Sequence, residues 1–252
     1  MSPLLIAALC LTMVGTAFLS GVFGMAGGLV LVGVLLALLP LPAAMALHAV
    51  TQMASNLWRA MLWWRHIQWR AAWPYGLGCS IALGLWSLTG YVPPLPVALI
   101  LLGGTPFLVR LLPPGLRPDP FSIKQGVGYG SVSMTLLLLT GVSGPLVDTF
   151  FLGGTLDRRS IVATKAVCQT LGHLFKLIYF AGVVDQATNL DPLMAVLAVL
   201  ASMLGTTLAR RLLEALTDQQ YRRWANRFIV GISSFYLAQG ALLLARPFLP
   251  WN

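Results

Sequence analysis

Acidic side chains are scarce in this sequence, which has 7 Asp and Glu residues against 16 Lys and Arg residues in a chain of 252. Charged residues make up only 9% of the chain, whereas 58% of it is hydrophobic. A water-soluble globule of this length cannot bury so many apolar side chains and still present a polar surface. Several apolar runs also approach the length that spans a bilayer, so we expect an integral membrane protein in contact with lipid.

Motifs of catalysis and cofactor binding are also missing. The sequence has no Walker A loop, no H-E-x-x-H, no G-x-S-x-G and no paired carboxylates on one segment. Neither ATP-driven pumping nor hydrolysis is therefore indicated, and we expect no enzyme and no cofactor. Cys10, Cys79 and Cys168 lie inside apolar runs without metal-ligand spacing, so we expect reduced packing residues and no metal site.

The net charge of +9 does not indicate nucleic-acid binding, because the basic residues stand at the ends of apolar runs, as in "RHIQWR", "DRRS", "ARR" and "YRRW". Such placement is typical of cytoplasmic loops under the positive-inside rule. The N-terminal "MSPLLIAALC" has no basic region before its apolar run. We therefore expect it to begin the first membrane segment and not a cleaved signal peptide.

The apolar segments predict helices at residues 4–20, 29–39, 43–64, 71–90, 94–112, 125–140, 145–156, 161–182, 192–213 and 225–247. The proline-rich stretch "PPGLRPDPFSI" separates the fifth segment from the sixth. It predicts a cytoplasmic linker over residues 113–123, between a first transmembrane repeat over residues 1–112 and a second over residues 124–252.

The two halves resemble each other in two stretches. Setting "SGVFGMAGGLV" against "TGVSGPLVDTF" aligns Gly21 with Gly141 and Gly24 with Gly144. Setting "MALHAVTQMASNLWR" against "VATKAVCQTLGHLFK" places two pairs of polar residues at the same offsets, Gln52 with Gln169 and Arg59 with Lys176. Shared polar positions in such an apolar chain indicate an internal repeat.

Basic loops lie at opposite ends of the two glutamine-bearing segments. "RHIQWR" follows the first segment, whereas "DRRS" precedes the second. The two segments are therefore predicted to run in opposite directions, as in an inverted repeat. Placing residues 65–70, 113–124, 157–160 and 210–224 in the cytoplasm puts both termini outside. The predicted fold is all-α, with two inverted repeats that each contain a glycine-broken helical hairpin and three transmembrane helices, giving 8–10 helical segments.

The stretch "LSGVFGMAGGLVLVG", followed by an alanine-rich polar helix, "RHIQWR" and "YGLGCSIALG", resembles the TauE/SafE sulfite exporter family. The resemblance covers essentially the whole chain. It implies secondary transport of a small sulfur-containing anion, such as sulfite or an organosulfonate, across the inner membrane of a prokaryote. It also implies an inverted-repeat bundle.

Each glutamine-bearing segment carries a polar stripe within an arc of about 80°. The predicted substrate-binding residues of these stripes are His48, Gln52, Asn56, Lys165, Gln169 and His173, and Arg59 and Lys176 are candidates for coupling or gating. A charge at the centre of a membrane helix costs about 2.5–3.5 kcal/mol, so such residues face the bundle interior. Their positive charges and hydrogen-bond donors suit an oxyanion. The alternative is that Arg59 and Lys176 snorkel to opposite interfaces while the amides join neighbouring helices.

The glycine breaks form the second part of the predicted substrate site, at Gly24, Gly27, Gly28, Gly141 and Gly144. Glycine permits backbone turns, and amides at the resulting helix N-termini attract anions. The alternative is close helix packing through small residues.

Asp148 is the one acidic residue well inside an apolar run. An ion pair with Lys165 would hold the empty site together, and the alternative is a proton carried in exchange for the anion. Alternating access at a midplane site is the predicted mechanism, with protons or another ion as the coupling partner. Two other classes of function remain open, a non-transporting membrane binding or assembly protein and a passive anion channel.

Overall fold

The computed structural model describes residues 3–23, 26–111, 119–152, 156–183 and 191–245. These residues form helices without strands, as expected of an all-α membrane protein. The α-helices are α1 (Pro3–Phe23), α2 (Ala26–Leu38), α3 (Leu41–Leu62), α4 (Trp69–Ser87), α5 (Leu95–Arg110), α6 (Ile123–Thr140), α7 (Gly144–Leu152), α8 (Arg158–Ile178), α9 (Pro192–Ala215) and α10 (Asp218–Ala245). Two short helices are added, η1 (Trp64–His66) and η3 (Tyr179–Val183). Each predicted apolar segment falls on one of the α-helices, and residues 113–118 of the predicted linker lie outside the described residues.

Local chemistry accounts for several helix ends. The side chains of Ser122, Asp157 and Asp191 accept hydrogen bonds from backbone N–H groups in the first turns of α6, α8 and α9. Helix α6 ends at Gly141, whose φ of 85° is left-handed and whose N–H donates to the carbonyl of Leu137. The second glycine break thus begins where the chain adopts a conformation that favours glycine.

Three stretches of the described residues are long and apolar enough to cross a membrane, namely Ile6–Phe23, Pro192–Ala215 and Asn226–Ala245. Shorter apolar helices lie at Ala26–Leu38 and Leu95–Thr105. Helices α3 and α8 have 22 and 21 residues. Their polar stripes reduce their mean hydropathy, and the surrounding helices shield those stripes from lipid.

The outer surface of α9 is apolar along its length. Exposed side chains recur at helical spacing at Val196, Leu200, Leu204, Leu208 and Leu212. An exposed stripe of this kind suits lipid contact and would be unfavourable in water.

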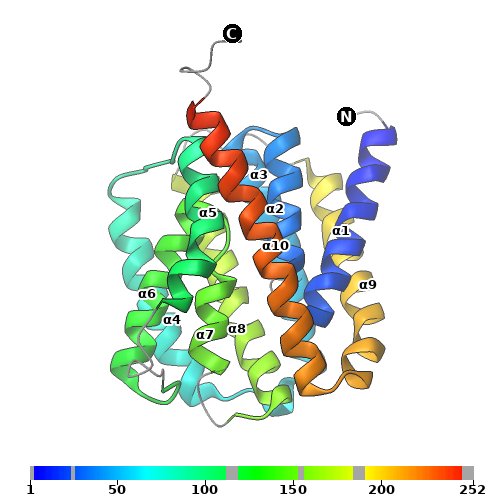
Figure 1. Cartoon of the computed structure of the whole chain (residues 1–252), viewed down its shortest axis with the longest axis vertical. Coiled ribbons are helices and arrows are strands. Elements are labelled where there is room, and N and C mark those ends of the chain that lie inside the picture. The colour runs from blue at the N-terminus through cyan, green and yellow to red at the C-terminus, as the bar shows by residue number, and fades with distance from the viewer. Residues whose placement is uncertain (1–2, 24–25, 112–118, 153–155, 184–190, 246–252) are drawn as a thin grey trace.

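Figure 1 shows that α1 runs towards the lower end of the bundle and that α2 turns back upwards beside it. Helix α6 runs upwards, and α7 turns back downwards. Gly24, between α1 and α2 in the sequence, lies outside the described residues. Both glycine-broken regions therefore reverse direction inside the bundle.

The remaining helices pack mainly in pairs, with α1 against α9, α4 against α6, α5 against α10 and α3 against α8. Glycines allow the first two pairs to approach closely. A Cβ atom on Gly205 of α9 would collide with the carbonyl of Val14, and one on Gly130 of α6 would collide with the carbonyl of Tyr75. Small residues at such crossings let helix backbones pack closely in a membrane, where lipid tails are as apolar as the side chains.

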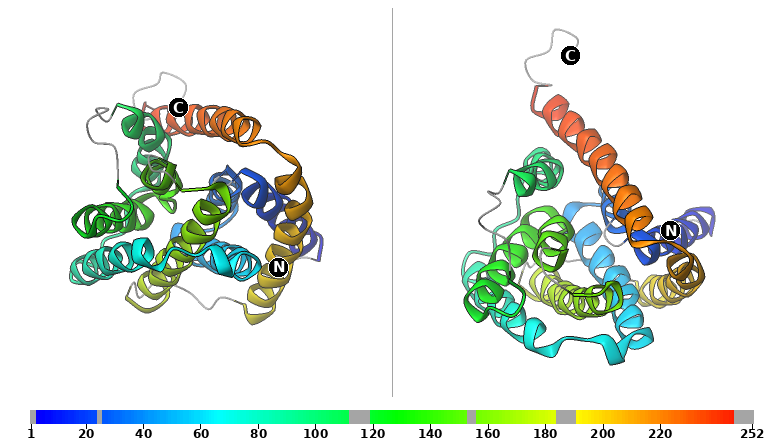
Figure 2. Two further views of the ribbon diagram at one scale, coloured as in Figure 1. Left: turned by 90° about the horizontal axis from the view of Figure 1, so that it is seen from below. Right: turned by 60° about the horizontal axis from the view of Figure 1, so that its bottom comes forward.

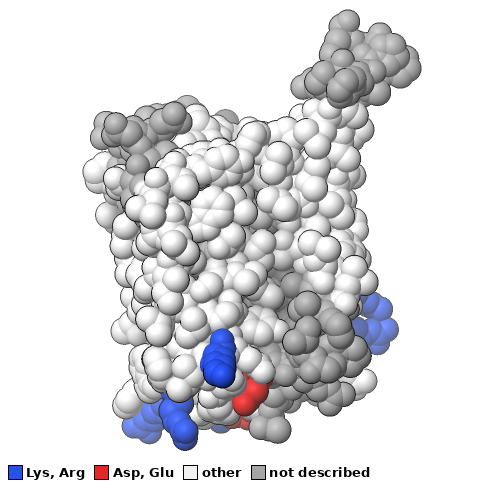
Figure 3. Space-filling model, turned by 90° about the vertical axis from the view of Figure 1, so that its left-hand side faces the viewer, with Lys and Arg blue, Asp and Glu red and all other residues white. Residues whose placement is uncertain are grey.

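Helix α3 lies inside the bundle, between α9 on one side and α8 on the other (Figure 2). On the face drawn in Figure 3, the visible Lys and Arg side chains gather at the lower end, and the surface above them is uncharged. The basic loops after α3 and before α8 reach this lower end, while the ends of α1 and α10 nearest the chain termini lie at the upper end (Figure 1).

Candidate functional site

The polar stripes of α3 and α8 face each other inside the bundle. The end of α8 lies beside the start of α3, since Lys176 contacts His48, and the start of α8 lies beside the end of α3, since Thr164 accepts from the N–H of Gln68. The two helices are therefore antiparallel. We call the buried polar residues between them and the adjoining α7 the polar core, which consists of His48, Gln52, Asn56, Arg59, Asp148, Lys165, His173 and Lys176. None of these residues is more than 9% exposed.

The upper part of the polar core, which we call the histidine end, is built around Lys176. Its side chain is fully buried, and its Nζ lies 3.1 Å from the carbonyl oxygen of Gly141, to which it donates, and 2.9 Å from Nδ1 of His48. The other ring nitrogen of His48, Nε2, lies 3.0 Å from the carbonyl oxygen of Gly28. Because a carbonyl can only accept, Nε2 carries the proton and Nδ1 accepts from the lysine. The contacts therefore fix one tautomer of a neutral His48 and join the two glycine breaks through two side chains.

Two more polar side chains complete the histidine end. The ring of His173 meets the ring of His48 edge-on, with centroids 5.5 Å apart. Among the described residues, neither Nδ1 of His173 nor Nε2 of Gln52 has a hydrogen-bond partner. A Cβ atom on Gly28 would lie 3.1 Å from Oε1 of Gln52, so the first glycine break also lies directly against this amide. Buried polar atoms without partners are costly, which is why their presence often marks a binding site.

The lower part of the polar core, the arginine end, contains a carboxylate. Lys165 forms an ion pair with Asp148 of α7, as the sequence predicted. Arg59 donates from a terminal nitrogen to Oδ1 of Asn56 at 3.4 Å, and Asn56 in turn donates to the carbonyl of Gln52 at 2.8 Å. The charge of Arg59 also acts on Lys165. Two cations and one carboxylate thus share this end.

Positive charge exceeds negative charge in the polar core. The cationic side chains Arg59, Lys165 and Lys176 are buried together with the single carboxylate of Asp148. Within the described part of the chain, no carboxylate lies within ion-pair distance of Lys176. Buried charge is stable only when it is paired or hydrogen-bonded, so this arrangement has the electrostatic character of an anion site.

Most of the predicted site residues come together here, with some differences in detail. Gln169 is only half-buried, unlike Gln52. Arg59 and Lys176 are 5% and 0% exposed, so neither snorkels to an interface. Gly144 is buried at the first position of α7.

The glycine breaks contact the polar core differently from the prediction. In the contacts described, Gly28 and Gly141 contribute carbonyl oxygens to His48 and Lys176, whereas the sequence predicted amide donors. Gly27 packs against α1, where a Cβ atom would collide with the carbonyl of Thr16. Gly24 lies outside the described residues. The breaks therefore combine close packing with direct hydrogen bonding to the stripes.

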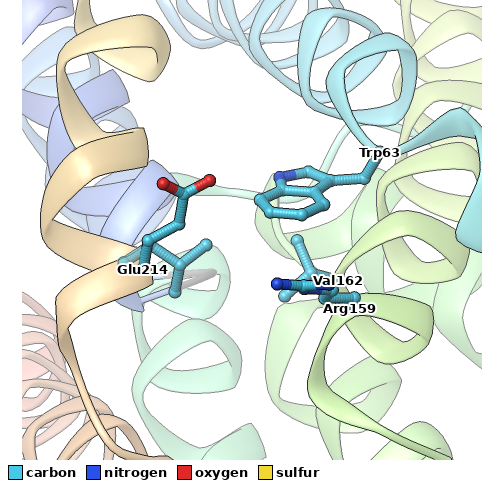
Figure 4. A pocket seen from close by; sticks show the side chains of 5 residues that line it. Trp63, Arg159, Val162 and Glu214 are labelled. Atoms are coloured by element: carbon cyan, nitrogen blue, oxygen red, sulfur yellow. The ribbon is translucent and has the colours of Figure 1, made fainter.

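Sequence reasoning missed a small pocket of about 10 Å³ at the lower end of the stripes (Figure 4). It is lined by Trp63, Arg159, Val162, Leu213 and Glu214. Trp63 is half-buried, whereas the nearby Trp64, Trp69 and Trp73 are 51–63% exposed. The sequence position of Trp63 could have indicated this pocket, because Trp63 lies one helical turn beyond Arg59 on the same stripe.

No group of three or more His, Cys, Asp and Glu side chains in the described part of the chain could hold a metal ion. The polar core instead offers donors and positive charge. Such a set can bind a small anion by charge-assisted hydrogen bonds.

A comparison with protein families matches residues 8–236 to the family described as sulfite exporter TauE/SafE. Comparisons with curated proteins and with solved structures returned no match. The family match spans nearly the whole chain and includes every member of the polar core. The chain therefore belongs to the sulfite exporter TauE/SafE family, a family of membrane transporters and not of enzymes.

Proposed function

We propose that this chain is a secondary transporter that exports a small sulfur-containing anion, such as sulfite or an organosulfonate, and binds it in the polar core. The observation that carries the proposal is Lys176, a fully buried cation with only a carbonyl and an imidazole as its described hydrogen-bond partners. A bound anion would supply the missing negative charge. Family membership supports the same class of substrate.

The anion would bind beside Lys176, near two buried polar atoms that lack described partners. Nε2 of Gln52 is a donor and would bind an oxyanion oxygen directly. Nδ1 of His173 would do so in the tautomer that carries its proton there. Lys165, Asn56 and Gln169 would extend the site along the stripes. Asp148 would hold Lys165 in place while the site is empty, as the ion pair between them suggests.

We also propose that the two halves, residues 1–112 and 124–252, form inverted repeats. Packing supports this, because the pairing of α1 with α9 has a counterpart in the pairing of α6 with α4, and α3 meets α8 at the centre. Contacts support it as well. Continuing the alignment of the glycine breaks places Gly28 opposite Asp148. Gly28 contacts His48, and Asp148 contacts Lys165. His48 and Lys165 are also aligned with each other in the two glutamine-bearing segments.

Alternating access would follow from this arrangement. One repeat would rock against the other about the crossing of α3 and α8, exposing the polar core first to one side and then to the other. The basic lower end would face the cytoplasm of a prokaryotic cell, with both termini outside, in agreement with the positive-inside rule. An ion or substrate gradient would drive net export.

The proposal is tested by the flux of radiolabelled sulfite into liposomes that contain the purified protein, with organosulfonates and thiosulfate as competitors. The sequence has three lysines, and they provide a matched pair of variants: Lys176→Gln in the polar core and Lys124→Gln on the exposed start of α6. We expect Lys176→Gln to lose about 10- to 100-fold in flux, because a hydrogen bond to a charged group contributes about 1.5–3 kcal/mol. Lys124→Gln should transport like the wild type.

Different outcomes would reject different parts of the proposal. Wild-type flux no higher than in empty liposomes under any imposed gradient would reject sulfite transport and favour the membrane assembly protein. Electrical current without counter-flow would identify a passive channel. Equal flux from the two lysine variants, with both folded as judged by gel filtration and circular dichroism, would remove Lys176 from the site.

A further inference from the structure

The pocket at the lower end of the stripes is formed by side chains of three different helices. Two guanidinium groups make cation–π contacts with the indole of Trp63, at the end of α3. The guanidinium carbon of Arg159 in α8 lies 5.5 Å from the ring centroid, and that of Arg210 in α9 lies 5.6 Å from it. Arg210 is held by Glu214, whose carboxylate accepts from Nε at 3.1 Å. Figure 4 shows Trp63 and Glu214 on opposite sides of the small space, with Arg159 and Val162 beside it.

This cluster lies directly next to the polar core. Trp63 is one turn beyond Arg59 along α3, and Val162 is one turn before Lys165 along α8. Both core residues are buried, at 5% and 4% exposure, whereas Arg159 and Arg210 are exposed. The aromatic ring and its two arginines thus separate the arginine end from the aqueous surface.

The contacts that hold Arg159 and Arg210 between the arginine end and the surface are easily broken. Cation–π contacts and ion pairs between exposed groups are weak, because water competes for the charges. The pocket of about 10 Å³ beside Trp63 has room for about one water molecule. An anion that arrives here would compete with the ring and with Glu214 for the arginines.

We propose that Trp63, Arg159 and Arg210 form the cytoplasmic gate of the transport pathway, with Glu214 holding Arg210 on the ring. The gate closes the arginine end when both arginines lie on Trp63. It opens when they leave the ring, and the freed guanidinium groups then bind the small oxyanion that enters. This inference rests on the proposed function for the identity of the ligand, but not for the existence of the barrier.

The opposite end of the stripes is closed in another way. Continuing the alignment of Arg59 with Lys176 places Trp63 opposite Phe180. Phe180 is fully buried and belongs to the main apolar core, and its neighbour Tyr179 donates to the carbonyl of Tyr91. An apolar plug at one end and a cation–aromatic cluster at the other indicate that the cytoplasmic gate is the one that oxyanions help to open.

The gate is tested by the accessibility of a cysteine placed behind it. The variant Val162→Cys, combined with Cys10→Ala to remove the partly exposed natural thiol, is incorporated into inside-out vesicles. Its reaction rate with a membrane-impermeant maleimide is then measured. Adding Trp63→Ala should raise the rate by about tenfold, Trp63→Phe by less because a ring remains, and Glu214→Gln by about threefold because Arg210 is released.

Trp64 supplies a matched control, since it is the adjacent tryptophan, it has Arg65 at 5.5 Å from its ring, and it is 63% exposed outside the pocket. Trp64→Ala should leave the labelling rate unchanged. Equal rates for Trp63→Ala and its parent would overturn the gate, and so would an equal rise in the Trp64→Ala variant. Sulfite flux is measured separately in the same vesicles, so a wild type that labels as expected but carries no sulfite would reject the substrate and leave the barrier in place.

Discussion

Lys165 and Lys176 are both buried on α8, yet different partners hold them. Lys165 has a carboxylate, Asp148, supplied by the second glycine hairpin. Lys176 has a carbonyl from Gly141 and a ring nitrogen from His48. Each lysine contacts a residue of the second glycine break, but only Lys165 has a carboxylate as its partner.

The difference assigns separate tasks to the two ends. At the arginine end, the internal carboxylate of Asp148 already compensates Lys165, one of the two cations there. The histidine end has donors and positive charge without a described carboxylate, so the proposed anion would gain most by binding there. A substitution that gives Lys165 and Lys176 similarly charged partners should therefore affect transport or stability more than a substitution that leaves those partners different.

The largest effect is expected from removing the carboxylate of the arginine end. Asp148→Asn leaves Lys165 as a buried cation without its partner, and breaking one side of a buried ion pair costs about 3–5 kcal/mol. We expect a clearly lower midpoint of thermal unfolding in detergent. The double variant Asp148→Asn with Lys165→Met should recover most of the loss, and an unchanged midpoint in the single variant would contradict the pairing.

The same variant separates the two roles considered for Asp148. If this carboxylate only holds Lys165, exchange of labelled for unlabelled sulfite and gradient-driven flux should fall together. If it carries the proton, gradient-driven flux should vanish while exchange persists. We expect the first result.

A carboxylate placed at the histidine end should make it resemble the arginine end. Gly28→Asp introduces the charge at the position that aligns with Asp148, next to His48 and Gln52. Gly28→Asn introduces almost the same volume without charge and serves as the control. We expect sulfite flux to be about tenfold lower in the aspartate variant than in the asparagine variant, because the new carboxylate competes with the substrate for Lys176. Equal flux would mean that no anion binds at this end.

A smaller effect is expected from straining the backbone at Gly141, whose carbonyl accepts from Lys176. Gly141→Ala forces alanine into a left-handed conformation, at about 1–2 kcal/mol, and brings its Cβ to 2.8 Å from Sδ of Met45. Gly90→Ala has the same kind of strain, with a φ of 57°, but its Cβ meets open space. Thermal unfolding should therefore be lowered more by the first variant, and only the first should reduce sulfite flux. A loss of flux in both variants would show a general effect of strain.

The smallest effect is expected at the helix starts. Helix α8 begins with Asp157, whose carboxylate accepts from Ser160 and from two backbone N–H groups, whereas α3 begins at Pro40 without a side-chain cap. The hydrogen bond from the hydroxyl of Ser160 lowers the pKa of Asp157 below its usual value of 3.8. Its stabilising contribution is thus complete above pH 3.8 and is lost as the pH falls through the lower pKa of the folded state.

Replacing Asp157 should remove the same stabilising contribution at neutral pH. Asp157→Ala is expected to lower the free energy of unfolding by about 1 kcal/mol. It should also flatten the acid limb of the stability profile measured by circular dichroism. Asp191→Ala, which removes the corresponding cap of α9, is the control for a cap remote from the arginine end. An acid limb in Asp157→Ala as steep as in the wild type would assign the acid sensitivity to another group.

The stripes could be predicted because they depend on spacing along single helices. Gln52, Asn56 and Arg59 fall on one face of any α-helix, and burying charge in a membrane helix requires that face to point inward. The pairing of Asp148 with Lys165 was also predictable, since Asp148 is the one acid well inside an apolar run. The pocket beside Trp63 could not be predicted, because spacing alone does not tell which side chain of a helix end turns towards a neighbouring helix.

By itself, the sequence determined that the chain is an all-helical membrane protein, which segments are helical and which polar residues must be hidden from lipid. Composition, periodicity and loop charge are sufficient for these conclusions because the bilayer imposes the same constraint on every segment. Only the tertiary structure decided that Lys176 reaches His48 and Gly141, that the glycine carbonyls and not their amides meet these side chains, and that two arginines from different helices meet on Trp63. The reason is physical: these contacts join residues far apart in the chain, and their distances depend on how closely glycine allows the helices to pack.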